Sequence, residues 1–318
     1  MTEDVKKPEQ SEQPQQVKKL KNEDWEMLID RIQRRGCTPF LGPGVSVDGY
    51  NQRAQIARAF AKDFDYPMDD CDDLARVGRF VSVKFSADYA RNKLLDAYQK
   101  LPPVNLQNRT DPHVVLASLP IPVYVTTNHN DFMMQALKAQ YKDPHPELCK
   151  WNKSIIETSK FLKERNDPTP AQPVVFHLYG HPQVSAEGTI LNSLVFTEDD
   201  YYEFLIKVAS DEKAIPLRVR RAMAGTSLLL LGYRMEERDF RVLFHYLLAK
   251  PLQVSTDRVH VAVQVPLDEA RAEEQQRKVQ EFLTRYIVSK QVDIRVYWGT
   301  SQEFAAELKT RWEATNHE

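Results

Sequence analysis

The sequence predicts an α/β protein of the Rossmann-like type, with a parallel sheet and helices on both faces. Six short apolar runs, each closed by polar or glycine-bearing residues, alternate with amphipathic stretches of helical period. This alternation indicates parallel strands buried on both faces, which read as continuous apolar runs. The runs are CTPFLGPG, PVYVTTN, VVFHLYG, SLLLLGY, HVAVQVP and DIRVYWG, and the unbroken SLLLLG is expected at the centre.

The helices have their own start signals. Asn22 is expected to cap a first helix, because Trp25 and Leu28 follow at helical spacing and Gly36 supplies a stop. Capping boxes at Thr197 and Thr300, with acids three residues later, predict helices over 198–208 and 301–313.

The ordered domain is expected to span residues 22–318. Residues 1–21 are Lys, Glu, Gln and Pro with almost nothing to bury, which predicts a disordered tail. The stretches 67–101 and 132–170 fit the strand and helix alternation less well and are expected to form a small helical subdomain over one edge of the sheet.

Composition narrows the function classes. The formal net charge of the 318 residues is −2 and basic residues are spread along the chain, which disfavours a nucleic-acid or membrane surface. Three distant cysteines, Cys37, Cys71 and Cys149, disfavour a disulfide framework and a sequence-local zinc site. With no membrane-spanning run and no signal-like apolar segment after MTEDVKK, we expect a soluble cytoplasmic protein whose partner is a small molecule or another protein.

Ligands of doubly wound sheets bind outside the carboxyl ends of the strands, so the residues that end each run are the site candidates. The Gly42-Pro43-Gly44 turn suits close approach to a phosphate, although Pro43 has no N–H to donate and a tight structural turn is the alternative. After the next run, six polar residues from Thr126 to Asp131 either cap a helix or bind a hydroxyl-rich ligand.

The run that ends in FHLYGHP carries two histidines. If the strand extends from Val174 to Tyr179, His177 and Tyr179 share one face and look toward the pocket, with Gly180 leaving room for a ligand. A hydrogen-bonded structural histidine is the plainer reading of either imidazole. In the run ending LLLLGYR, Gly232 either admits an adenosine or ribose or is an ordinary turn.

Taken in order, GPGVS, TTNHND, VFHLYGHP, SLVFTEDDYYEFL and LLLLGYRMEERDF resemble the bacterial sirtuin-like domain family, which includes NAD-hydrolysing effectors of antiviral defence. The resemblance implies NAD contacts at the phosphate loop, the polar cluster and the last two strand ends. By position these are Gly42, Gly44, Ser46, Thr127, Asn130, Asp131, Tyr179, Gly180, Gly232 and Tyr233.

The resemblance also assigns the chemistry. Asn128 matches the asparagine that positions the nicotinamide ribose and the attacking water. The family's histidine stands immediately before the glycine, where this chain has Tyr179, a poor base at neutral pH. Three alternatives stay open: His177 supplies the imidazole, which we favour; His181 reaches in from the turn; or base catalysis is weak or absent.

The function implied is an NAD glycohydrolase that releases nicotinamide and ADP-ribose. A sirtuin-type protein deacylase or ADP-ribosyltransferase is a rival, although the four-cysteine zinc module of such deacylases cannot form from three cysteines. An inert sensor of NAD or ADP-ribose is the second rival, because Pro43, Asn130 and Tyr179 all depart from the family pattern. The resemblance further implies a homo-oligomer and a regulatory partner protein.

Overall fold

The computed structural model describes residues 20–46, 49–153, 155, 166–181, 193–235, 238–248, 258–264, 273–289 and 294–316. The disordered tail expected for residues 1–21 lies almost wholly outside them, as does part of the stretch 132–170.

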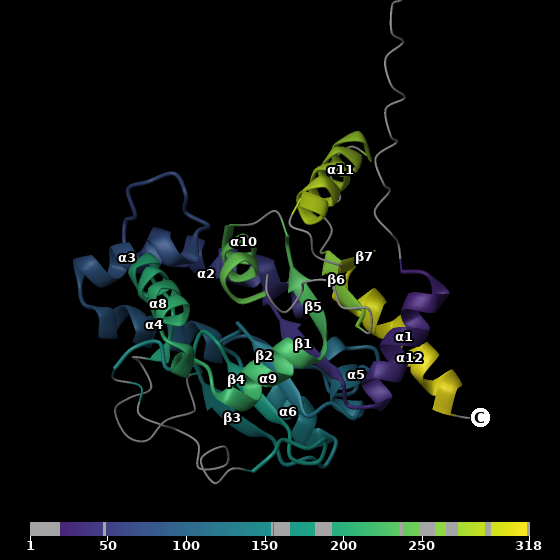
Figure 1. Ribbon diagram of the computed structural model, residues 1–318. Coiled ribbons are helices and arrows are strands. Elements are labelled where there is room, and N and C mark those ends of the chain that lie inside the picture. Colours follow the sequence, from purple (N-terminus) through teal and green to yellow (C-terminus); the bar gives the residue numbers. More distant parts are fainter. Residues whose placement is uncertain are drawn as a thin grey trace, which may run out of the picture.

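The described residues form a sheet of seven parallel strands in the order β3-β4-β2-β1-β5-β6-β7 (Figure 1). All six apolar runs are strands, and β5, the SLLLLGY run, lies buried between β1 and β6 as expected. The strands are β1 (Cys37–Leu41), β2 (Val123–Thr126), β3 (His145–Leu148), β4 (Val174–His177), β5 (Ser227–Tyr233), β6 (His260–Gln264) and β7 (Ile294–Trp298).

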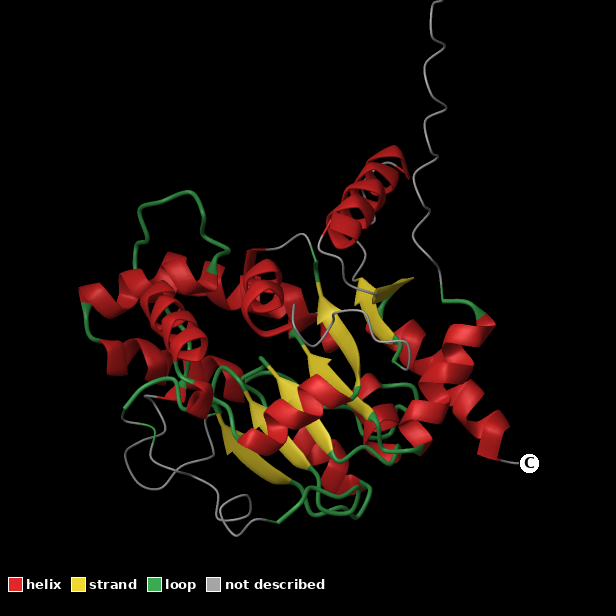
Figure 2. Ribbon diagram, in the orientation of Figure 1, coloured by secondary structure: helices red, strands yellow, loops and turns green. Residues whose placement is uncertain are grey.

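Helices cover both faces of the sheet, which confirms the predicted α/β class (Figure 2). Alternate residues of the central strands point to opposite sides: Phe40 and Leu230 belong to one core, whereas Leu41 and Leu231 belong to the other. The helices are α1 (Asn22–Gln33), α2 (Gly49–Asp63), α3 (Leu74–Lys84), α4 (Ala87–Gln99), α5 (Pro112–Ser118), α6 (Phe132–Ala139), α8 (Glu198–Ser210), α9 (Leu217–Gly225), α10 (Arg238–Leu243), α11 (Glu273–Ser289) and α12 (Ser301–Asn316).

The two predicted capping boxes are confirmed, and the first helix differs in detail. Thr197 Oγ1 accepts from the Asp200 amide, and Thr300 Oγ1 accepts from the Glu303 amide, at the starts of α8 and α12. Helix α1 begins at Asn22, so its N-cap residue is Lys21 and not Asn22. The Lys21 amide donates to the Asp24 carboxylate at 2.9 Å. The left-handed residue at its end is Arg35, with φ of 60°, one position before Gly36.

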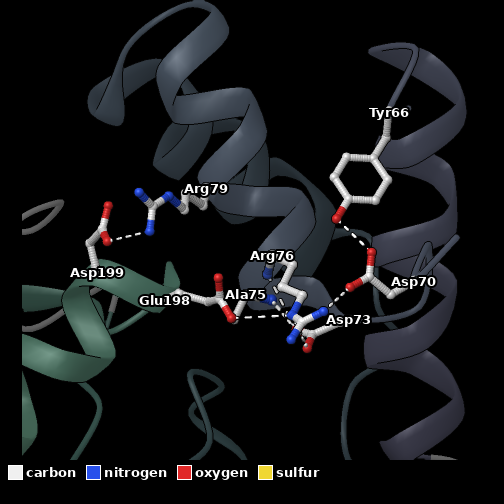
Figure 3. A network of polar contacts seen from close by, with 8 residues as sticks. All are labelled: Tyr66, Asp70, Asp73, Ala75, Arg76, Arg79, Glu198 and Asp199. Carbon is white, nitrogen blue, oxygen red and sulfur yellow. Dashed lines mark hydrogen bonds and ion pairs between the residues drawn. The ribbon is translucent and has the colours of Figure 1, made fainter. Parts of the chain in front are cut away.

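Helices α3 and α4 occupy the stretch 67–101, and together with α2 they enclose an apolar core of their own. This helical unit, defined as α2, α3 and α4, is fixed to the start of α8. Arg76 and Arg79 of α3 pair with Glu198 and Asp199 across the gap (Figure 3). Beneath them, the ring of Phe196 lies so close to Gly78 that a Cβ there would meet it at 2.5 Å.

The stretch 132–170 does not join the helical unit in its described part. It contains α6 and the edge strand β3, with the sequence HPEL, which the apolar pattern does not reveal. Pro146 lacks an N–H and Glu147 is charged, so the sequence of these four residues is typical of a turn. An edge strand tolerates proline because the backbone groups on its outer side need no partner strand. The domain boundaries themselves stay a prediction.

Candidate active site

The carboxyl ends of β2, β1 and β5 are bonded to one another. Beyond β2, the Thr127 amide donates to the Leu41 carbonyl of β1 at 3.0 Å. The Thr127 hydroxyl lies 3.1 Å from the Tyr233 hydroxyl at the end of β5. These contacts bridge three adjacent strands, so the loops that leave them hold fixed positions.

Two of the predicted glycines allow β1 and β5 to approach this closely. A Cβ on Gly42 would lie 2.7 Å from the Gly232 carbonyl oxygen and from the Tyr233 ring. Gly232 has φ of 75°, and a Cβ there would lie 2.2 Å from the Val45 nitrogen. The structural-turn reading of the Gly-x-Gly sequence therefore has a direct steric basis.

The amide donors of the turn are partly used within the chain. The Gly42 N–H donates to Leu231, and the Val45 N–H donates to the Gly42 carbonyl. The Gly44 carbonyl accepts from the Ser301 hydroxyl at 3.1 Å. The Ser46 hydroxyl, in contrast, is buried without a hydrogen-bond partner among the described residues. Ser46 is thus the member of the loop that still offers a polar group.

Two hydrogen bonds hold Asn128, one from its side chain and one from its backbone. Its side-chain Nδ2 donates to the Gly42 carbonyl at 2.9 Å, and its backbone N–H donates to the Thr126 hydroxyl at 3.0 Å. One N–H of the amide is engaged by Gly42, so Asn128 can offer its side-chain oxygen Oδ1 as an acceptor and its second N–H as a donor.

Asn128 faces a cleft of about 390 Å³, a volume that includes space open to solvent. One side, the strand-end wall, comprises Pro43, Ser46, Thr127, Asn128, His129 and Asn130. The other side, the helical wall, comprises Gln52, Arg53, Tyr98 and Leu101, contributed by α2, α4 and the residues just after α4. The cleft therefore lies between the sheet and the helical unit.

His129 is the histidine of the strand-end wall. Its Nε2 lies 3.1 Å from the Tyr179 carbonyl oxygen, and its Nδ1 lies 3.5 Å from the Tyr98 hydroxyl. Burial, and then the positive charge of Arg53, lower its pKa to about 3. The imidazole is consequently neutral at physiological pH.

His177 and His181 lie behind the cleft lining, with ring centroids 4.3 Å apart. Burial and the neighbouring His181 hold the pKa of His177 well below its usual range, although the backbone of Asn128 favours the protonated ring. Neither nitrogen of His177 has a hydrogen bond of good geometry to a described residue. Burial lowers the pKa of His181 to about 4, opposed by Asp131.

Tyr179 does not share a face with His177, and that prediction is wrong. Strand β4 ends at His177, and the chain turns before Tyr179. The Tyr179 ring packs edge-on against Tyr201 and Phe204 of α8, in the opposite core. Gly180, with φ of 85°, makes room for the Ser193 carbonyl, which a Cβ would meet at 2.1 Å.

Comparison with known proteins identifies the fold. A model of the SIR2-like domain family matches residues 122–287, more than half of the chain. The chain belongs to the SIR2-like domain family. The NAD(+) hydrolase ThsA of Acinetobacter baumannii (strain 532279) is 23% identical to the chain over 219 residues, which are 66% of this chain and 40% of that protein. The SIR2-like chain therefore spans less than half of that relative.

Four of the residues expected to line a site in this SIR2-like domain do line the cleft: Ser46, Thr127, Asn128 and Asn130. Gly42 and Tyr233 support them from behind by the contacts described above. Asp131 is the N-cap residue of α6, and its carboxylate accepts from Gln135 at 2.6 Å. The NAD contacts expected of all these residues stay predictions, as do the catalytic roles of Asn128 and His177.

Sequence reasoning missed the helical wall. Gln52 and Arg53 lie in an ordinary amphipathic helix, and Tyr98 reads as a core position at helical spacing. Nothing in their local pattern distinguishes them. Of the described residues, no group of three or more His, Cys, Asp or Glu side chains is arranged to hold a metal ion, and no helix is long and apolar enough to cross a membrane.

Proposed function

We propose that the cleft of this SIR2-like domain binds NAD and hydrolyses its nicotinamide-ribose bond. The observation that carries the proposal is the fixed amide of Asn128: this residue lines the cleft, and the Gly42 carbonyl accepts a hydrogen bond from its Nδ2 at 2.9 Å. An amide oxygen orients a water molecule by accepting a hydrogen bond from one of its O–H groups, without a change of charge. The relative named as an NAD(+) hydrolase supports the same reaction.

The remaining groups of the cleft suit a dinucleotide. Arg53 places a permanent positive charge on the helical wall, opposite the hydroxyls of Ser46 and Thr127. A guanidinium suits the paired phosphates of NAD, and hydroxyls bind either phosphate or ribose. Both charge and hydrogen-bonding capacity are therefore present on the two sides of the cleft.

The reaction needs little from the protein beyond position. Water adds to the ribose carbon as the bond to the pyridinium nitrogen breaks, nicotinamide leaves as a neutral ring, and one proton of the water is released. Asn128 aligns the water, and the cleft walls hold the ribose in the reactive pose. His177 is assigned as the proton acceptor in place of the histidine that the resemblance expects at Tyr179, with His181 as the alternative; burial lowers the pKa of both rings, so each is neutral and able to accept a proton, although weakly basic.

A non-hydrolysing sensor of NAD or ADP-ribose is the second candidate function. The observation in its favour is Tyr179, whose ring is turned into the core at the position where the resemblance expects a histidine. Binding without turnover is the property that distinguishes this candidate. The homo-oligomer, the regulatory partner and the role in antiviral defence belong to the proposal on the resemblance alone, and the cytoplasmic location belongs to it on the sequence pattern described above.

The test incubates the purified protein with NAD and follows nicotinamide and ADP-ribose by chromatography, with NAD binding measured by calorimetry. Asn128→Ala is expected to reduce turnover by about 10²–10³-fold, the range for loss of one positioned polar group in an active site. Asn105→Ala is the matched control, since Asn105 is exposed and outside the cleft lining. Its turnover should equal that of the wild type.

Two variants address the base. His177→Ala and His181→Ala are compared under the same conditions, and loss of turnover in one of them with retained NAD binding identifies the proton acceptor. Binding without any turnover supports the sensor. Absence of both NAD binding and nicotinamide release from the wild type contradicts the proposed function.

A further inference from the structure

His129 is the one histidine among the described residues that lines the cleft. It follows Asn128 directly at the end of β2, and the Tyr98 ring of α4 packs edge-on against it with centroids 5.6 Å apart. His177 and His181, although close to Asn128 in the sheet, lie outside the lining. The imidazole that a bound molecule meets is therefore that of His129.

The two contacts of His129 determine which nitrogen carries the proton. A carbonyl oxygen only accepts, so Nε2, which lies 3.1 Å from the Tyr179 oxygen, must be the N–H. In the neutral ring Nδ1 then has the lone pair, and its contact with the Tyr98 hydroxyl, at 3.5 Å, is at the outer limit of a hydrogen bond. Nδ1 is thus a weakly engaged acceptor in the wall of the cleft.

The ring keeps this acceptor at every physiological pH. Burial, the charge of Arg53 and the neighbouring His181 all disfavour a proton on His129, whereas the backbone carbonyls of Tyr179 and Val195 favour it; the pKa is lowered to about 3. The cleft thus contains a neutral hydrogen-bond acceptor and a guanidinium, which suit different groups of a nucleotide. Arg53 suits the phosphates, which only accept, and Nδ1 suits a group that donates.

We propose that His129 is a substrate-positioning residue whose Nδ1 accepts a hydrogen bond from a ribose hydroxyl of the nucleotide. The inference rests on the proposed function. It follows from adjacency: Asn128 is assigned to the ribose carbon that is attacked, and the next two carbons of the same sugar ring each carry a hydroxyl. His129 is the next residue along the wall and presents the matching acceptor.

Two substitutions separate this role from a structural one. Gln places its amide where Nε2 stands, so His129→Gln keeps a donor for the Tyr179 carbonyl and loses the acceptor. Asn places its oxygen where Nδ1 stands, so His129→Asn keeps the acceptor and loses the donor. The loss is tolerable because the Tyr179 oxygen also accepts from the Val195 amide at 3.0 Å.

The experiment measures kcat and KM for NAD, and the affinity of ADP-ribose and of nicotinamide alone by calorimetry. His129→Gln is expected to raise KM and weaken ADP-ribose binding about tenfold, with a smaller change in kcat and none in nicotinamide binding. His129→Asn is expected to stay within about threefold of the wild type. His245→Gln, at an exposed histidine away from the cleft lining, is the control and should change nothing.

The inference is overturned if His129→Gln behaves like the wild type and His129→Asn does not. That pattern would mean that only the hydrogen bond from Nε2 to the Tyr179 carbonyl matters. Wild-type values in both variants, or equal losses in both accompanied by a lower melting temperature, overturn it as well. A wild-type protein that neither releases nicotinamide nor binds ADP-ribose shows instead that the proposed function itself has failed.

Discussion

The two walls of the cleft are built on different principles. In the strand-end wall, Asn128 and Thr127 are bonded to backbone carbonyls of β1 and its loop, and glycines at 42 and 232 bring backbones into direct contact. The helical wall belongs to a unit with its own apolar core, fixed to α8 largely by side-chain ion pairs. Rigid backbone contacts position the groups assigned to chemistry, whereas the groups assigned to phosphate binding stand on a separately packed unit.

Gly42→Ala is expected to have the largest effect, because it breaks the strand-end wall at its tightest contact. The new Cβ would meet the Gly232 oxygen and the Tyr233 ring at 2.7 Å, and both strands are buried. We expect a loss of about 3 kcal/mol or more in unfolding free energy, as for severe overpacking, together with loss of NAD turnover through the displaced Gly42 carbonyl that holds Asn128.

Gly225→Ala is the matched control for that substitution. Gly225 is the last residue of α9, and a Cβ there meets nothing within 4 Å. Its unfolding free energy in urea should equal or slightly exceed that of the wild type, since alanine is the better helix former by about 1 kcal/mol. Similar stability of the two alanine variants would contradict the steric account of Gly42.

Lowering the pH is expected to reduce the unfolding free energy through three histidines on the strand-end side. His129, His177 and His181 are buried and neutral in the folded protein. The unfolded chain takes up a proton on each near pH 6.5, whereas the folded chain does so only near pH 4 at His181 and pH 3 at His129. Their contribution is therefore fully present above pH 6.5 and is lost as the pH falls. Between pH 7.5 and 5.5 the unfolding free energy should fall by about 1 kcal/mol per histidine.

Urea unfolding at the two pH values measures this loss. His181→Gln should remove about a third of the difference, since one of the three neutral rings is then gone. Equal unfolding free energies of the wild type at pH 7.5 and 5.5 would show that these rings do not stay neutral in the folded protein.

The helical wall is expected to depend on one ion pair more than on the others. Arg91 and Asp200 are both buried and 2.5 Å apart, and Asp200 also accepts from the Thr197 amide. Arg91→Leu leaves that carboxylate buried without its cation, at a cost of about 3 kcal/mol. Arg79→Leu, which removes the exposed pair with Asp199, should cost less than about 1 kcal/mol.

Thermal or urea unfolding of the two leucine variants measures the difference in unfolding free energy. In 1 M salt, the contribution of the exposed Arg79–Asp199 pair should fall far more than that of the buried Arg91–Asp200 pair. A loss for Arg79→Leu as large as that for Arg91→Leu would mean that the surface network in Figure 3 fixes the helical unit.

The sequence was sufficient for six of the seven strands of the described sheet and for the strand-end wall, because apolar runs and the residues that end them are local signals. It placed Asn128 and Thr127 correctly at the carboxyl edge. It failed where the outcome depends on distant packing: β4 ends two residues early and turns Tyr179 toward α8, and the edge strand around Pro146 has almost no apolar residues. The helical wall depends on how α2 and α4 dock against the sheet, which no local pattern encodes.

The bond between Thr127 and Tyr233 joins residues 106 positions apart in the chain. During synthesis the polar cluster after β2 leaves the ribosome well before β5, whose backbone packs against the Gly42 loop that anchors Asn128. A nascent chain that ends before Tyr233 therefore lacks a properly held Asn128. The site proposed to hydrolyse NAD is therefore assembled only after β5 has been synthesised and has paired with β1.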